Sequence, residues 1–403
     1  MIEIDVFING PINIVRLEGE VLSNQKTIKK TLYLFFDIHV DKTECIDIQS
    51  TNIEKYLYKN IDKQNKTHPK IKYDLFLETF PSRISYFDSG KKGPIYMDHM
   101  RKFFAYFNKN DKHKPIKNLR LHYFDVRVVF TMEKFDPSGS PLDELRYLIR
   151  TIAFDHHSHP GSFKACDQIL AMYIKKITQM NILFSNEIKY IKSDKRMDSN
   201  DINDNLDELT YDIFMNNIVY KIKNKYSNEN IKDKMNEIIN TYLTNPSTEL
   251  LSNLKKLKTI LTDIQGAINE HYENLCLGIS FPEKLKLNKK LYNLYKFYLI
   301  VDDKLSVLLV NLTDVFFIRR YLDKNYINHG LHYAGAYHST NVINILVKYF
   351  DFKITNITYA SIPIDEMEAK FKKSTDVYDL EKLVIPARLY QCSNLKGFPK
   401  NLF

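Results

Sequence analysis

Two histidines stand directly after apolar runs that are typical of β-strands, and they are the residues best placed for chemistry in this chain. His39 ends the sequence FDIH, and His338 ends the sequence GAYH. The carboxyl ends of parallel strands share one edge of a sheet, and open parallel sheets bind their ligands at that edge. We therefore predict that the two imidazoles lie at the same edge of one sheet.

Three charged residues, Glu78, Asp125 and Arg127, end two further predicted strands in the same way. We expect all three to meet the histidines at one rim of the sheet. Without a metal ion, such groups can serve as general base, general acid and orienting partner. Arg127 would then stabilise an oxyanion or a phosphate, and Asp125 would help to position the substrate.

The same rim contains a ligand set for a divalent metal ion. Two neutral imidazoles, His39 and His338, and the carboxylate of Glu78 would leave one coordination position open for water. The pKa of a metal-bound water falls far enough to make it a nucleophile near neutral pH. The residue types do not separate this metal-assisted hydrolysis from the route without metal.

A structural role is the alternative for each of these residues taken singly. A histidine beside a strand is often a hydrogen-bonded structural residue, and Asp125 with Arg127 can form a buried ion pair. The repeated placement of polar groups after strands favours a functional site made by His39, His338 and Glu78 together.

The order of these motifs resembles a superfamily that joins erythromycin esterase, the haem-binding lipoprotein ChaN and the Wnt-clipping metalloprotease TIKI. Its members carry an early strand ending in GxxH or GExH, a glutamate after a following strand, and a late GxxH turn before a helix. The matching residues here are His39, Glu78 and His338. The resemblance implies a hydrolase. Phe36 replaces the first glycine of the early motif, which indicates a descendant with altered or lost activity.

The chain is also similar to proteins of large nucleocytoplasmic DNA viruses, whose early motif reads GDIH or GDVH. This similarity implies a viral protein that works in the host cytoplasm, at the viral factory, or in the virion. Its partner would be an unknown substrate or a viral or host protein. A non-catalytic viral structural or protein-interaction factor is therefore the first alternative to a hydrolase.

The elements that must position these side chains indicate an α/β protein. Apolar runs bounded by polar turns predict strands at 31–36, 73–77, 119–126, 331–334 and 353–359. The helices expected between them cover 48–61, 96–106 and 340–350, the last after a turn at 335–338. This alternation predicts a mainly parallel sheet with right-handed crossovers, built from both ends of the chain.

Helical periodicity dominates the middle of the chain. Apolar residues spaced as on one helix face begin at Pro160 and recur over 209–224, 231–243, 247–275 and 284–324. An acid-rich run at 193–208 lacks this spacing and predicts a mobile loop. We therefore expect an N-terminal α/β portion (1–160), a large helical insertion (161–300) and a C-terminal α/β portion (301–403) that completes the same sheet.

The composition indicates which cellular compartment and which class of binding partner to expect for this protein. The 403 residues are 44% hydrophobic, which is enough for a large core. The net charge of +9 is spread among acidic residues, so nucleic-acid binding is only the second alternative. The first residues show no signal pattern and no apolar run is long enough to span a bilayer, so we expect neither secretion nor membrane spanning.

The cysteines predict a reducing compartment. They lie far apart, show no metal-ligand spacing, and indicate neither a disulfide framework nor a zinc ribbon. The four are Cys45, Cys166, Cys276 and Cys392. Cys45 lies six residues beyond His39, and we expect it to be a buried apolar thiol rather than a nucleophile.

Overall fold

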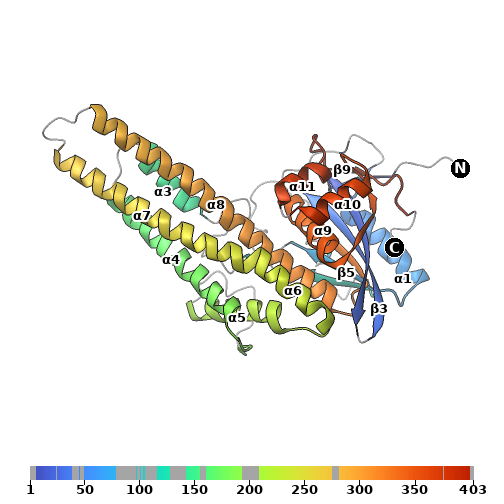
Figure 1. Ribbon diagram of the computed structural model, residues 1–403. Coiled ribbons are helices and arrows are strands. Elements are labelled where there is room, and N and C mark those ends of the chain that lie inside the picture. The colour runs from blue at the N-terminus through green and yellow to red at the C-terminus, as the bar shows by residue number, and fades with distance from the viewer. Residues whose placement is uncertain are drawn as a thin grey trace.

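A mostly parallel sheet formed from both ends of the chain carries a long arm of helices (Figure 1). The computed structural model describes residues 6–23, 25–38, 45, 50–78, 97, 100, 103–104, 116–127, 142–154, 160–192, 208–274, 281–374 and 376–399. The predicted mixed α/β class, with helices inserted between the two halves of the sheet, is confirmed.

The main sheet has six strands in the order β6-β5-β7-β3-β2-β8. Their bounds are β2 (Asn13–Ser23), β3 (Lys26–Asp37), β5 (Tyr73–Leu77), β6 (Leu119–Tyr123), β7 (His329–Gly335) and β8 (Lys353–Ile357). Strands β6, β5, β7 and β3 run parallel to one another, while β2 is antiparallel to both of its neighbours. Strand β7, from the C-terminal part, is thus inserted between two strands of the N-terminal part.

Helices cover both faces of this sheet. Alternate residues of β3 point to opposite faces, so Tyr33 joins one apolar cluster and Leu34 joins the other. Helix α1 (Ile53–Thr67) covers the first face, while α8 (Phe281–Asp323) and α9 (Ala336–Phe350) pack on the second (Figure 1). Burial on both faces explains why β3 carries the apolar run 32–36 and why β5 is apolar except for Asp74.

Four helices, α3, α4, α7 and the first half of α8, pack along one another to form the arm (Figure 1). The remaining bounds are α3 (Asp143–Phe154), α4 (Pro160–Ser185), α5 (Glu208–Asn224), α6 (Lys232–Ile239), α7 (Asn245–Asn274), α10 (Ile364–Lys373) and α11 (Val377–Val384). A short 3-10 turn (Glu229–Ile231) precedes α6, and a π-helical segment (Asn240–Thr244) joins α6 to α7. Helix α8 is continuous through residue 300 and connects the arm to the sheet.

Several predicted elements fall where expected, and others shift. Strand β5 matches the run 73–77, and β3 extends five residues further toward the N-terminus than predicted. Helix α9 begins at Ala336, so the predicted turn at 335–338 is mostly the first turn of that helix. Of the predicted helix at 96–106, residues 97, 100, 103 and 104 are described, and all four are helical. The acid-rich run at 193–208 lies outside the described residues except for its last residue.

A second, small sheet contains one cysteine of a disulfide that the sequence did not predict. Its strands are β1 (Phe7–Asn9), β4 (Thr51–Asn52) and β9 (Cys392–Asn394), in the order β4-β1-β9. Cys45 and Cys392 form a disulfide, with their Cα atoms 5.0 Å apart. The predictions of no disulfide and of a buried Cys45 thiol are therefore wrong. The pair is 347 residues apart, so chain spacing cannot reveal it.

We expect this disulfide to stabilise the fold. Cys45→Ser and Cys392→Ser should each lower the free energy of unfolding by about 2–4 kcal/mol, because the bond restricts the unfolded chain. The double variant should lose no more than either single variant. Peptide mapping under non-reducing conditions should recover the two cysteines in one linked peptide pair, and additive losses or unlinked peptides would contradict the bond.

The described helices include none with both the length and the apolar run that a membrane crossing requires.

Candidate functional site

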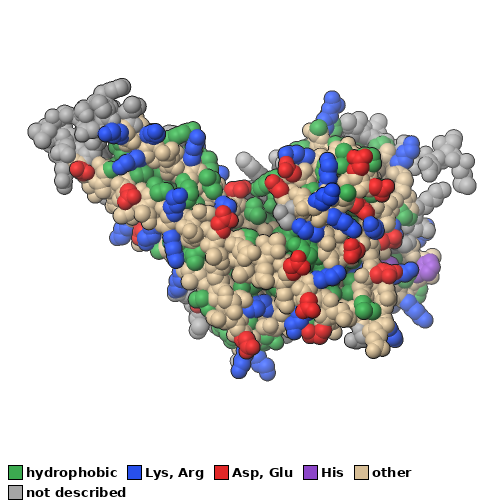
Figure 2. Space-filling view, in the orientation of Figure 1, with side chains coloured by type: hydrophobic (Ala, Val, Ile, Leu, Met, Phe, Trp, Pro, Cys, Tyr) green, Lys and Arg blue, Asp and Glu red, His purple; other side chains and the backbone are tan. Residues whose placement is uncertain are grey.

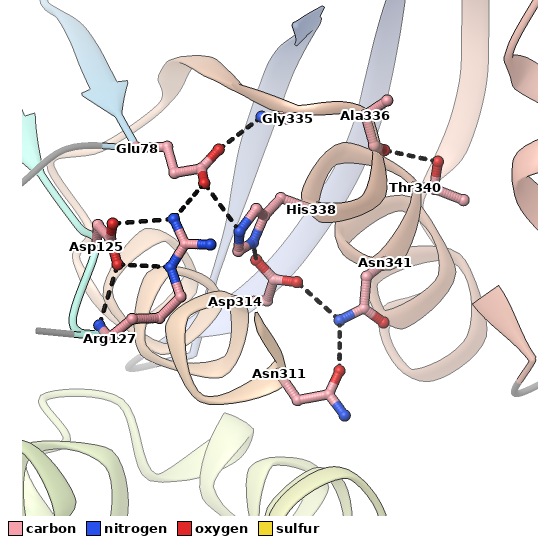
Figure 3. Close-up of polar contacts among 10 residues, drawn as sticks. All are labelled: Glu78, Asp125, Arg127, Asn311, Asp314, Gly335, Ala336, His338, Thr340 and Asn341. Atoms are coloured by element: carbon pink, nitrogen blue, oxygen red, sulfur yellow. Dashed lines mark hydrogen bonds and ion pairs between the residues drawn. The ribbon is translucent and has the colours of Figure 1, made fainter. Parts of the chain in front are cut away.

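Four of the five predicted site residues meet at the carboxyl edge of the parallel strands (Figure 3). Glu78 directly follows β5, Asp125 and Arg127 follow β6, and His338 lies in the first turn of α9 after β7. The fifth, His39, lies outside the described residues.

The pairing of β3 with β7 brings the end of β3 next to the site. Asp37, the last residue of β3, pairs with Gly335, the last residue of β7. Gly335 itself donates its backbone N–H to the site. His39 is therefore two residues along the chain from a strand end that borders the site.

Glu78 is the central acceptor of the cluster and is only 6% exposed. Its Oε2 accepts a hydrogen bond from the backbone N–H of Gly335 at 2.6 Å. Its Oε1 accepts from Nη2 of Arg127 at 2.5 Å and lies 3.1 Å from Nε2 of His338, an ion-pair distance. One carboxylate thus ties together the ends of β5, β6 and β7 (Figure 3).

Arg127 and Asp125 form a second ion pair beside this carboxylate. The Nε and Nη2 atoms of Arg127 donate to the two carboxylate oxygens of Asp125 at 3.0 and 2.9 Å. Burial raises the pKa of Asp125, but Arg127 outweighs it and holds this pKa below its usual value. Burial lowers the pKa of Arg127, but Asp125 and Glu78 outweigh it, so the guanidinium stays charged. Its side chain is 23% exposed, against 2% for Glu78, so the guanidinium is the more accessible of the two groups to solvent.

Asp314 of α8 completes the site, and sequence reasoning missed it. Its Oδ1 lies 2.6 Å from Nδ1 of His338, while its Oδ2 accepts from Nδ2 of Asn341 at 2.8 Å. The amide of Asn341 also donates to Oδ1 of Asn311 (Figure 3). A lone aspartate inside the apolar helical run VNLTDVFF was the available signal, because a buried carboxylate requires a partner.

His338 is held between two carboxylates. Burial lowers its pKa, but Glu78 and Asp314 together outweigh burial and raise the pKa to about 9. Burial also raises the pKa of Asp314, although the imidazole opposes that shift. At neutral pH the ring is therefore an imidazolium that is hydrogen-bonded to Asp314 through Nδ1 and lies at ion-pair distance from Glu78 through Nε2. Such a group can donate a proton or stabilise developing negative charge.

A second histidine, His332 of β7, lies on the same face of the sheet and was not predicted. It is fully buried, with its ring centroid 4.5 Å from that of Phe317 and 4.9 Å from that of Phe124. Neither ring nitrogen has a hydrogen-bond partner among the described residues. Burial, assisted by the nearby charge of His338, lowers the pKa of His332 to about 3.

His332 should destabilise the fold in acid. Its folded-state pKa lies below the unfolded value of 6.5, so stability is lost as pH falls from about 6.5 to 3. The slope contributed by one such group is about 1.4 kcal/mol per pH unit. We expect His332→Phe to remove this part of the acid limb in urea unfolding measured from pH 7 to 4. An unchanged slope in the variant would show that His332 takes up a proton without unfolding.

The predicted metal ligands are only partly described. Among the residues whose placement is described, no group of three or more His, Cys, Asp or Glu side chains is arranged to hold a metal ion. Glu78 and His338 face each other rather than a shared point, because Nε2 of the ring lies against Oε1 of the carboxylate.

Fold and site together define a three-layer α/β protein with a buried histidine–carboxylate–guanidinium cluster at the carboxyl edge of its parallel strands. The chain belongs to a protein family of unknown function, DUF5847, whose family model matches residues 6–403. No solved structure matches the chain.

Its relatives include three uncharacterized proteins of Acanthamoeba polyphaga mimivirus. R706 is 29% identical over 98% of this chain and 96% of its own length. R161 is 27% identical over 98% of each chain, and R160 is 28% identical over 98% of this chain and 96% of its own. The predicted kinship with proteins of a large DNA virus is confirmed.

Proposed function

We propose that this viral protein is a hydrolase that acts at the edge formed by Glu78, Arg127 and His338. The observation that carries the proposal is the position of His338. Asp314 orients one ring nitrogen, and the other points to the carboxylate that closes the site. Buried acid and base groups that shift one another's pKa are typical of catalytic sites.

Each residue has a role that follows from its surroundings. Arg127, the partly exposed cation, would bind the carbonyl oxygen or another anionic group of the substrate. Glu78 would accept a proton from the attacking water, and the imidazolium of His338 would donate a proton to the leaving group. Asp125 would keep the guanidinium in place, and Asp314 would keep the imidazole in place.

The resemblance to the esterase, ChaN and TIKI superfamily supports this proposal through Glu78 and His338. In that superfamily a glutamate follows the second strand and a histidine lies in the late GxxH turn. Both residues occupy these positions here and lie 3.1 Å apart. The third residue of that pattern, His39, lies outside the described residues.

The proposed route is the one without metal. In the described arrangement, Oε1 of Glu78 is taken by the guanidinium of Arg127, and Nε2 of His338 lies against the same oxygen. A cation in the place that a metal ion would need, and a protonated ring, do not fit a divalent ion. The proposed proton transfers therefore use no metal ion.

Activity profiling of the full-length chain tests the proposal. A panel of carboxylic esters, amides and phosphate esters should include one class that wild type hydrolyses. His338→Ala should slow that reaction roughly 100-fold or more, as expected for a general acid. His68→Ala, which removes an exposed histidine after α1, should leave the rate unchanged. Unchanged activity in His338→Ala would overturn the proposal. Metal analysis of wild type, His39→Ala and His338→Ala should accompany the assay, and a metal content that falls in both variants together with the activity would contradict the route without metal.

A non-catalytic interaction factor of the virus or virion is the second candidate. It is favoured by large apolar side chains exposed on α3 and α8 of the arm: Tyr147 (70%), Tyr292 (50%), Ile300 (48%) and Leu299 (38%). A stoichiometric complex that resists salt, formed by a chain inactive toward every ester and amide, would favour this role. In either role we place the protein in the host cytoplasm, at the viral factory, or in the virion.

Nucleic-acid binding gains little support from the surface. Figure 2 shows Lys and Arg side chains interspersed with Asp and Glu over the visible face, rather than gathered into a stripe. Binding of a nucleic acid would lose affinity steeply with added salt.

A further inference from the structure

Four cations gather where the last turn of α5 meets the last turn of α8, apart from the proposed active site. We call them the basic cluster: Lys221 of α5, Lys225 just beyond it, and Arg319 and Arg320 of α8. Arg319 donates to the backbone carbonyl of Lys225 at 2.9 Å, which fixes the two helix ends together.

Lys221 lies in a field of like charge. The charged groups that act on it are Lys225, Arg319 and Arg320, all of them cationic. Burial lowers the pKa of Lys221, and these three neighbours lower it further. No carboxylate pairs with its ammonium in the described part of the chain. Such clustering is unfavourable unless an anion joins it.

The arginines are only weakly compensated. Of the carboxylates that the structure describes, only that of Asp323 acts electrostatically on Arg319. This carboxylate already accepts from the backbone N–H groups of Ser227 and Asn228 and forms an ion pair with Lys324. Arg319 is 3% exposed, yet its Nε has no hydrogen-bond partner among the described residues. A buried donor without an acceptor is costly, so Arg319 retains hydrogen-bonding capacity that no described residue uses.

Arg320 is oriented by a neutral partner. Its Nη2 donates to Nδ1 of His122 at 3.0 Å, so the proton of this ring resides on Nε2, 2.7 Å from Oδ1 of Asp74. Burial lowers the pKa of His122, which agrees with a neutral ring. Asp74 is neutralised by Arg120. The charge of Arg320 is thus held in place but not cancelled.

We propose that the basic cluster binds a phosphoryl group of a small phosphorylated molecule. Several fixed cations with free N–H donors match the many acceptor oxygens of phosphate better than the two of a carboxylate. The cluster is confined to two helix ends and is half-buried, which favours a compact ligand over a nucleic-acid strand. This site goes beyond the proposed hydrolase and does not depend on it.

Binding of inorganic tripolyphosphate to the full-length protein, measured by calorimetry at low salt, tests the proposal. Lys221→Gln and Arg320→Gln should each weaken binding about tenfold or more, because a charge-assisted hydrogen bond is lost. Lys289→Gln, an exposed lysine about 46 Å along α8 at 1.5 Å per residue, makes the same charge change and should leave binding unchanged.

A second readout separates a binding role from a structural one. Lys221→Gln relieves repulsion, so it should raise the unfolding temperature of the unliganded protein while weakening the ligand's effect. Equal binding by wild type and all three variants would overturn the proposal. So would an unliganded Lys221→Gln protein that is less stable than wild type, or binding of a single-stranded oligonucleotide without binding of tripolyphosphate.

Discussion

Glu78→Gln is expected to lower the free energy of unfolding by about 3–5 kcal/mol, the usual cost of breaking a buried ion pair from one side. The carboxylate accepts from Gly335 and Arg127 and pairs with His338. Glutamine carries no charge, so Arg127 and His338 would each keep only one carboxylate, that of Asp125 and that of Asp314. Denaturant unfolding at neutral pH measures the loss.

The control for this substitution is Glu237→Gln in α6, an exposed glutamate for which we expect a change within about 0.5 kcal/mol. A loss at Glu78 no larger than at Glu237 would mean that Arg127 and His338 find other partners.

His338 should make the protein lose stability as the solution becomes basic. Its folded-state pKa of about 9 lies above the unfolded value of 6.5, so the imidazolium stabilises the fold fully below pH 6.5. That contribution is lost as pH rises through 9, and the 2.5-unit window corresponds to about 3 kcal/mol. Urea unfolding from pH 6 to 9.5 should show this decline in wild type.

His338→Gln should flatten the curve over the same window, since glutamine does not titrate. His68→Gln, on the exposed end of α1, should keep the wild-type curve. The histidine NMR signals offer a direct check, because one ring should titrate near pH 9. A wild-type stability that rises between pH 6.5 and 9 would contradict the imidazolium between Glu78 and Asp314.

The parallel strands could be predicted from the sequence because they are buried on both faces of the sheet. Residues 32–36 of β3 are a continuous apolar run, and β5 is apolar except for Asp74; such runs predict central strands. Strand β2 lies near the edge of the sheet, and its second half alternates buried and exposed residues. It therefore contains no continuous apolar run, and the sequence did not predict it. The helix boundaries in the arm shifted by a few residues, as helix ends carry weak signals.

The site was partly predictable for the same reason. Glu78, Asp125, Arg127 and His338 follow strands, and parallel strands bring their carboxyl ends to one edge. Asp314 comes from α8, a helix that packs across that edge. The position of Asp314 beside His338 depends on how α8 packs on the sheet, and no short sequence pattern predicts that packing. The disulfide likewise depends on pairing of distant strands.

Helix α8 runs through both the arm and the part of the molecule that contains the sheet. Its 43 residues span about 65 Å at 1.5 Å per residue, from the tip of the arm to the side of the sheet. Asp314 and Arg320 lie on this one element, less than two turns apart, so the orienting carboxylate of His338 and a cation of the basic cluster move together. A shift or rotation of the last turns of α8 would therefore displace both groups at once.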